Sequence, residues 1–158
     1  MKKPNIGLTE AQLKGVTEIL TASLSDLMVV YVKTRKHHWN VYGESFMELH
    51  KLFEAQYTQL EKNIDEVAER INKLGSKTIG TMDEFIKTSS LKESPGTYPT
   101  SIEMINDLLA DHETIIKALR KAIDDCGEKY KDAGTADFLT QLMEGHETIA
   151  WTLRRYNV

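Results

Sequence analysis

The sequence has few residues that break or cross-link a chain, and it has no long apolar run. Its 158 residues include three prolines and one cysteine, Cys126, which therefore has no partner for an internal disulfide and suits a reducing compartment. The longest uninterrupted apolar stretch is six residues, Leu27 to Val32, whereas a membrane span needs about 20. No apolar signal-peptide core follows the N-terminal lysines. We therefore predict a cytoplasmic protein with no membrane partner.

An excess of positive charge is also missing. There are 20 basic and 24 acidic residues, for a net charge of −4, so the field of the whole protein should repel nucleic acid. The content of 41% hydrophobic and 28% charged residues is typical of a globular protein, and the length suits one core. We predict a single domain over residues 1–158.

Several catalytic signatures are absent from the sequence. No Glu has a His three residues later, which removes the ExxH pairs of a di-iron site inside one helical bundle. The His-Glu dipeptides at 112–113 and 146–147 begin like HExxH zinc motifs, but Ile and Ala occupy the second-histidine positions. There is no phosphate-binding loop or GxSxG elbow, so nucleotide hydrolysis and triad chemistry have no support.

Helix-start signals, in contrast, recur along the chain. Four capping boxes, in which a Ser or Thr precedes a Glu or Gln by three residues, are Thr9 with Gln12, Ser45 with Glu48, Thr81 with Glu84, and Thr100 with Glu103. A fifth helix is predicted to start near Thr135. Helix ends are predicted at three glycines, Gly43, Gly75 and Gly127.

Apolar residues recur every three or four positions between these signals, as on one face of a helix. The pattern predicts a first helix that includes residues 13–31, and further helices over 46–74, 102–123 and 138–156. The first and third connections are short, but residues 75–99 form a long one with a small helix around 82–87. We predict an all-α, ferritin-like four-helix bundle with a long crossover that carries a short extra helix. A simple up-down bundle with a flexible middle loop is the alternative.

Four polar residues on the second predicted helix share one flank. At 100° per residue, His50, Glu54, Asp65 and Glu69 project between about 40° and 140° from Phe46, whereas the apolar stripe centres near −25°. Such a flank beside the core is where another subunit would pack.

No single chain can close a metal site from these four residues, because Glu54 and Asp65 are about 16 Å apart along the helix. If a second copy packs antiparallel about a two-fold axis between residues 59 and 60, residues whose numbers sum to 119 meet. His50 and Glu54 of one subunit would then lie beside Asp65 and Glu69 of the other.

His38 continues the apolar seam of the first helix and is a further candidate ligand. Imidazole with several carboxylates suits Fe(II), and Zn is a competitor. Carboxylates on a helix flank are, however, usually a solvated face, and a histidine on an apolar seam is usually a core residue with one hydrogen bond. Burial separates these interpretations, because buried converging carboxylates need a cation or a proton.

Three stretches, HWNVYG at residues 38–43, LH at 49–50 and AERI at 68–71, together with Phe46 and Asp65, closely resemble the Dps (DNA-binding protein from starved cells) family of mini-ferritins. The resemblance spans essentially the whole chain, including WTLR at 151–154. It implies a hollow dodecamer that oxidises Fe(II), preferably with hydrogen peroxide, and stores a ferric mineral inside.

Carried over by position, the resemblance places the ferroxidase ligands on His38, His50 and Glu54 of one subunit and on Asp65 and Glu69 of its two-fold mate. Each such inter-subunit site would hold two iron ions. Glu54 stands where many members have Asp, so a longer side chain supplies the same carboxylate.

The resemblance also implies roles for Trp39, as a radical or electron relay beside the di-iron centre, and for Asp132 and Asp137, as carboxylates lining a three-fold iron-entry pore. Each residue has a simpler interpretation. An aromatic residue at a helix end usually packs in the core, and carboxylates in a first helical turn favour the helix dipole.

We therefore expect an iron-storage and peroxide-detoxifying ferroxidase. The alternative is a DNA-binding, nucleoid-protecting shell with secondary iron chemistry, and a third hypothesis is a structural oligomer with an inactive metal site. The only basic residues before the first predicted helix are Lys2 and Lys3. Together with the negative net charge, this argues against direct DNA binding.

Overall fold

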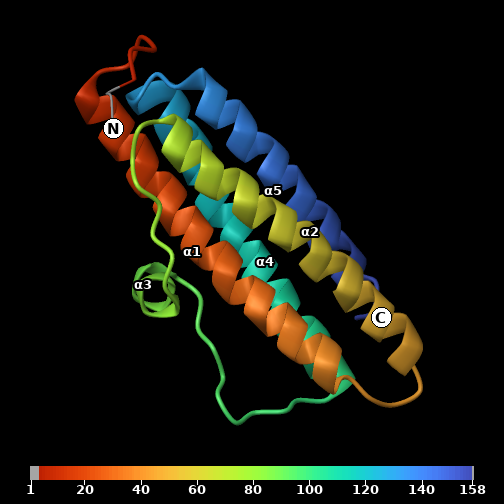
Figure 1. The fold of residues 1–158 in the computed structure, drawn as a ribbon. Helices are drawn as coiled ribbons and strands as arrows, with labels where there is room; N and C mark the ends of the chain where they lie inside the picture. Colours follow the sequence, from red (N-terminus) through yellow and green to blue (C-terminus); the bar gives the residue numbers. More distant parts are fainter. Residues whose placement is uncertain (1–3, 158) are drawn as a thin grey trace.

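The computed structural model describes residues 4–157. Its elements are α1 (Glu10–Asn40), α2 (Phe46–Lys73), α3 (Met82–Thr88), α4 (Ser101–Asp124), a π-helical turn (Asp125–Lys129) and α5 (Ala133–Arg154). No strand occurs among the described residues. The four long helices form one elongated bundle, and α3 lies beside α1 (Figure 1). The all-α, ferritin-like prediction is confirmed.

Two helical hairpins make up the bundle. The most extensive contacts join α1 to α2 and α4 to α5, and α1 also packs against α4. The long connection from α2 to α4 runs along the bundle from one end to the other and carries α3 on the way (Figure 1). This is the predicted crossover, and the simple up-down alternative is wrong.

The core is formed by the apolar seams of all four long helices. Fully buried side chains include Leu20, Leu27, Phe53, Leu60, Leu108, Leu139 and Leu153. Burying one such side chain stabilises the fold by roughly 1.5–3 kcal/mol. The helix periodicity read from the sequence therefore identifies the faces that pack together.

Helix α1 has the length and the apolar composition that would let it cross a membrane. Of the apolar window responsible, 56% is buried inside the bundle. A core helix that packs against neighbours on two sides needs the same composition. The apolar content of α1 is thus accounted for by its place between α2 and α4.

Three of the four predicted capping boxes are confirmed, at Thr9, Thr81 and Thr100. The prediction for Ser45 is wrong, because its side chain makes no cap bond and the Glu48 carboxylate instead accepts a 2.6 Å hydrogen bond from the Tyr156 hydroxyl. The tertiary contact with the turn that follows α5 replaces the local one.

The glycine stop at Gly75 is confirmed, since this residue follows the cap of α2 with φ 86°. Gly43 also has a left-handed φ of 100°, but α1 already ends at Asn40 with Val41 as its extended cap, so Gly43 turns the connection to α2. The prediction for Gly127 is wrong, because this residue lies inside the π-helical turn and the chain reverses at Lys131, with φ 56°. Helix α5 begins slightly before Thr135, where the Asp132 carboxylate caps it.

One buried carboxylate fixes the crossover to the bundle. Asp26 on α1 is 6% exposed and accepts hydrogen bonds from the Ser89 hydroxyl (2.7 Å), the Ser90 backbone N–H (2.7 Å) and the Ser90 hydroxyl (3.0 Å). These bonds hold the chain just after α3 against the middle of α1. They satisfy an N–H that lies outside any helix.

We expect Asp26→Ala to lower the free energy of unfolding by about 2 kcal/mol, because it leaves the donors of Ser89 and Ser90 without their acceptor. Urea unfolding measures the loss, and amide hydrogen exchange at Ser90 should accelerate. Asp83→Ala, which removes an exposed carboxylate on α3, is the control and should have a smaller effect. Unchanged exchange at Ser90 in Asp26→Ala would contradict the assignment.

Candidate metal centre

Two histidines lie together where α1 ends and α2 begins. The rings of His38 and His50 stack with their centroids 3.7 Å apart. The Nδ1 atom of His38 is 2.8 Å from the His50 carbonyl oxygen, and the Nδ1 atom of His50 is 2.9 Å from the His38 carbonyl oxygen. Since a carbonyl only accepts hydrogen bonds, each neutral ring carries its proton on Nδ1. Both Nε2 atoms are then bare lone pairs, which is the form in which imidazole binds metals.

Aromatic side chains hold this pair from both sides. The Tyr57 ring stands edge-on to His38 at 5.1 Å, and the Phe46 ring lies 5.1 Å from His50. The Arg35 guanidinium lies 4.4 Å from the centre of the Tyr57 ring and donates a 2.7 Å hydrogen bond to the Tyr31 hydroxyl. Tyr57 is therefore fixed against His38 by residues of α1.

The three carboxylates of the predicted ligand set are exposed on α2. Glu54 lies one helical turn after His50, whereas Asp65 and Glu69 lie further along the helix, and Glu69 accepts a 2.9 Å hydrogen bond from Lys73. Within residues 4–157, no three His, Cys, Asp or Glu side chains come together in a form that could hold a metal ion. One chain thus presents His38, His50 and Glu54 at one place and two carboxylates at another.

The surface beside the histidine pair is unusually apolar. Four side chains around the α1–α2 connection are exposed by 39–65%, namely Trp39, Tyr42, Phe46 and Met47. Exposed apolar patches of this kind are typical of protein–protein contact surfaces. The ring of Trp39 lies 5.4 Å from the Arg35 guanidinium. Trp39 is not a core side chain in this chain, and its relay role stays a prediction.

The two predicted pore residues have different surroundings. Asp132 is 6% exposed and accepts hydrogen bonds from the Thr135 backbone N–H (3.0 Å) and the Thr135 hydroxyl (2.5 Å), with Arg70 at 3.5 Å. Its carboxylate therefore caps α5 and joins it to α2. Asp137 is exposed and accepts a 2.9 Å hydrogen bond from Gln141. Their role in an iron-entry pore stays a prediction.

A charged cluster next to the site ties α1 to α4. Lys33 is buried, and its ammonium lies 2.5 Å from Asp111 and 3.0 Å from Asp107, which also bonds to His37 Nε2 at 2.9 Å. Burial opposes the charge on Lys33, but the two carboxylates outweigh it and raise the pKa of the lysine. Burial raises the pKa of Asp111. This cluster orients His37 away from His38.

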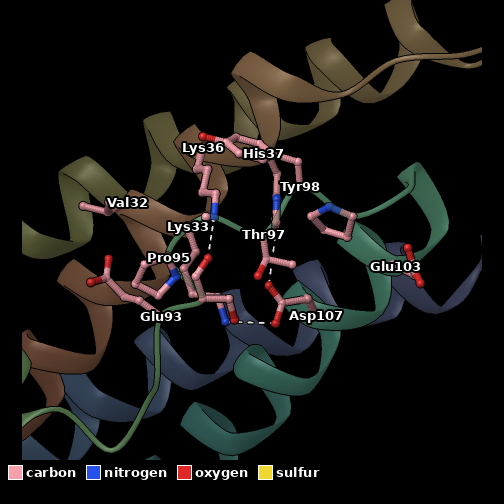
Figure 2. A pocket seen from close by; sticks show the side chains of 13 residues that line it. Val32, Lys33, Lys36, His37, Glu93, Pro95, Thr97, Tyr98, Glu103 and Asp107 are labelled. Atoms are coloured by element: carbon pink, nitrogen blue, oxygen red, sulfur yellow. Dashed lines mark hydrogen bonds and ion pairs between the residues drawn. The ribbon is translucent and has the colours of Figure 1, made fainter.

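Part of this cluster forms the floor of a cavity of about 720 Å³ between α1, the start of α4 and residues 93–99 of the crossover (Figure 2). Lys36 donates a 2.8 Å hydrogen bond to the Ser94 carbonyl and lies 5.3 Å from the centre of the Tyr98 ring. The charges of the floor are paired with one another. The cavity therefore lies where the crossover separates from the bundle. Its lining residues supply no further metal ligand beside His38 and His50.

Sequence patterns identified the histidines and carboxylates, but not the residues that hold them. Tyr57 is seven residues after His50, and Arg35 is three residues before His38, so both lie on the helix faces that carry the ligands. That spacing is a weak signal, because aromatic residues at helical spacing are common in cores. The ring contacts could be found only from the structure.

Comparison with known proteins shows what the chain resembles. A family model described as a ferritin-like domain matches residues 17–157. A low temperature-induced, uncharacterized protein of Nostoc sp. is 46% identical, with 99% of this chain and 87% of the relative covered. DNA protection during starvation protein 2 of Bacillus anthracis is 34% identical, with 90% and 97% covered.

Solved structures give the same result. A Dps protein from Vibrio cholerae O1, described as a member of a broad superfamily of ferritin-like diiron-carboxylate proteins, superimposes with a TM-score of 0.91 at 27% identity. The superposition covers 100% of this chain and 98% of that protein. The likeness therefore extends over the bundle, the crossover and both histidine-bearing helices.

Proposed function

Because this chain belongs to the Dps family of ferritin-like proteins, we propose that it is an iron-storage and peroxide-detoxifying ferroxidase. It oxidises Fe(II) with hydrogen peroxide or O2 and mineralises Fe(III) inside a hollow dodecamer in the cytoplasm. Membership of the family supports iron storage or DNA protection in general. The observation that favours iron oxidation is the reciprocal bonding of His38 and His50, which leaves two imidazole lone pairs side by side.

The proposed site is completed by a second subunit. His38, His50 and Glu54 of one chain and Asp65 and Glu69 of its two-fold mate would bind two Fe(II) ions as substrate. The exposed apolar side chains beside the histidines support this arrangement, because such patches are typical of contact surfaces. The three carboxylates are exposed and thus accessible to a second subunit. A homo-oligomer is then a requirement of the chemistry.

The ligand types fit the change in iron charge during the reaction. Two Fe(II) ions and two protons convert one hydrogen peroxide to two waters, so each iron loses one electron and the O–O bond breaks without release of hydroxyl radical. Carboxylate oxygens stabilise Fe(III) more than Fe(II), which favours the oxidised product. Glu54 keeps a carboxylate on a longer side chain, and Zn(II) competes for the same nitrogen and oxygen donors.

The first test replaces one ligand from each half of the proposed site. After anaerobic Fe(II) loading, addition of peroxide should give a rapid rise of ferric absorbance in the parent, and His50→Ala and Asp65→Ala should each abolish it. Glu66→Ala, which removes an exposed carboxylate next to Asp65, is the control and should keep the fast phase. A His50→Ala/Asp65→Ala protein that oxidises iron as fast as the parent would refute the site.

Sharing between subunits is tested by co-assembly of the two inactive chains. In a mixed dimer, one site carries both substitutions and the other carries neither. Random mixing should therefore restore about a quarter of the sites. If the mixture stays inactive, the ligands are not divided between two-fold related subunits.

The contact of Tyr57 with His38 gives a further expectation. Tyr57→Ala should weaken Zn(II) binding about tenfold, because a ligand that is no longer held in place must be ordered when the metal binds. Tyr57→Phe keeps the ring and should bind like the parent. Competition with a coloured chelator measures both affinities. Equal binding by Tyr57→Ala and the parent would show that the ring does not position His38.

The second candidate function is a DNA-binding shell, which is favoured by the name of the Bacillus anthracis relative. The net charge of −4 opposes it. We expect no gel shift of duplex DNA at low salt. A shift at low salt that disappears at higher salt would instead show phosphate contacts and support the second function.

A further inference from the structure

A second pair of histidines lies in the middle of the bundle, away from the proposed metal site. His112 on α4 and His146 on α5 are both 0% exposed, and their Nδ1 atoms are 2.8 Å apart. Neither Nε2 atom has a hydrogen-bond partner. These are the histidines of the two His-Glu dipeptides that resemble the start of a zinc motif.

The hydrogen bond between the rings requires two different tautomers. One ring carries its proton on Nδ1 and donates it, and the other ring accepts on Nδ1 and carries its proton on Nε2. The pair therefore leaves one bare Nε2 and one Nε2–H in the core. Leaving such groups unpaired costs free energy in an apolar environment.

A neutral amide lies at the same height of the bundle. Gln56 is 4% exposed, and neither of its side-chain polar atoms has a partner. Gln59, one turn later on α2, has its amide nitrogen only 3.1 Å from the position of a Cβ atom on Gly145. Because α2 and α5 run in opposite directions (Figure 1), this approach places Gln56 on the stretch of α2 beside the turn of α5 that carries His146.

The carboxylates that directly follow the two histidines are engaged elsewhere. Glu113 and Glu147, which follow the two histidines, form ion pairs with Arg154 and Arg120 on the opposite helix.

The charges that α1 contributes at this level are engaged as well, since Lys33 is paired with Asp107 and Asp111 of α4 and His37 is bonded to Asp107. Helix α2 contributes the neutral amide of Gln56 at this level instead of a charged group. In residues 4–157, no carboxylate forms an ion pair with either ring of the central pair.

We propose that His112 and His146 form a buried proton-binding pair that opens the α4–α5 hairpin, and with it the bundle, when the surroundings become acidic. The first proton goes to the bare Nε2 of the donor ring and places a positive charge in the core without a counter-ion. A second proton goes to Nδ1 of the acceptor ring and sets two N–H groups against each other. That step breaks the hydrogen bond between α4 and α5.

Burial places this response in the mildly acidic range. Burial lowers the pKa of His146 to about 4, and it lowers the pKa of His112 well below its usual value, with a further contribution from His146. An unfolded histidine has a pKa of about 6.5, so the unfolded chain binds more protons between pH 6.5 and 4. Stability is therefore lost as the pH falls through this range.

The experiment compares the parent with His112→Leu/His146→Leu, which fills the site with apolar side chains. Between pH 7 and pH 5, His146 alone should raise the unfolding equilibrium constant of the parent about 20-fold, and the double variant should lack this change. Urea unfolding at fixed protein concentration, followed by tryptophan fluorescence, measures both. Glu113→Gln/Glu147→Gln is the control and should keep the response of the parent in this range.

A second measurement needs no variant. The chain has five histidines, so solid-state NMR of the assembled, ¹⁵N-histidine-labelled protein can resolve their ring nitrogens. We expect two opposite neutral tautomers that persist at pH 5.5. The proposal is overturned if every histidine is protonated at pH 5.5, or if a folded double variant loses stability between pH 7 and 5 as the parent does. Neither outcome depends on whether the protein oxidises iron.

Discussion

The register between α1 and α2 is the constraint on which the rest of the site depends. Residues that face each other across this hairpin have numbers that sum to 88, as in His38 with His50 and Tyr31 with Tyr57. The five-residue connection and the left-handed Gly43 within it set this register. A slip of one residue would separate the two rings and would lose both bonds from Nδ1 to the backbone. The bare Nε2 atoms exist only because the backbone itself occupies the Nδ1 atoms.

Helix α4 and the crossover hold α1, and thus this arrangement, in place. Helix α4 is tied to α1 by the buried Lys33, and the crossover is tied to α1 by Asp26. Both contacts lie on α1, the helix that carries His38. Side chains on α2 that face away from this support remain exposed, and they include Glu54, Asp65 and Glu69. The core and the exposed carboxylates of the proposed interface therefore use different sides of α2.

Much of the fold follows from the sequence, because amphipathic periodicity and capping boxes are local. The boxes at Thr9, Thr81 and Thr100 form as predicted. Ser45 fails because Glu48 bonds to Tyr156, which is 108 residues away in the chain. Gly127 fails because the chain continues as a π-helical turn up to Lys129. Long-range contacts of this kind leave no trace in a window of a few residues.

Prediction of the candidate site is limited in the same way. Residue types and spacing identify His38 and His50 as candidate ligands, but only the structure shows their reciprocal bonds to the backbone. The contact of Tyr57 with His38 has no sequence signature beyond helical spacing. Asp65 and Glu69 can complete the site only from a second subunit. The sequence pattern of a polar helix flank is the same whether the flank faces water or a partner, so it does not reveal that subunit.

The two histidine pairs show how the same side chain is suited to different ligands. At one end of the bundle, both Nδ1 atoms donate to backbone carbonyls, so both rings present a lone pair on Nε2, the form in which imidazole binds metals. In the core, the Nδ1 atoms bond to each other, so the rings cannot both present lone pairs outward. Glu54 lies one helical turn after His50 of the first pair, whereas the carboxylates next to the second pair in the sequence, Asp111, Glu113 and Glu147, are bonded to lysine or arginine. The partner of Nδ1 thus distinguishes the pair that we propose for metal binding from the pair that we propose for proton binding.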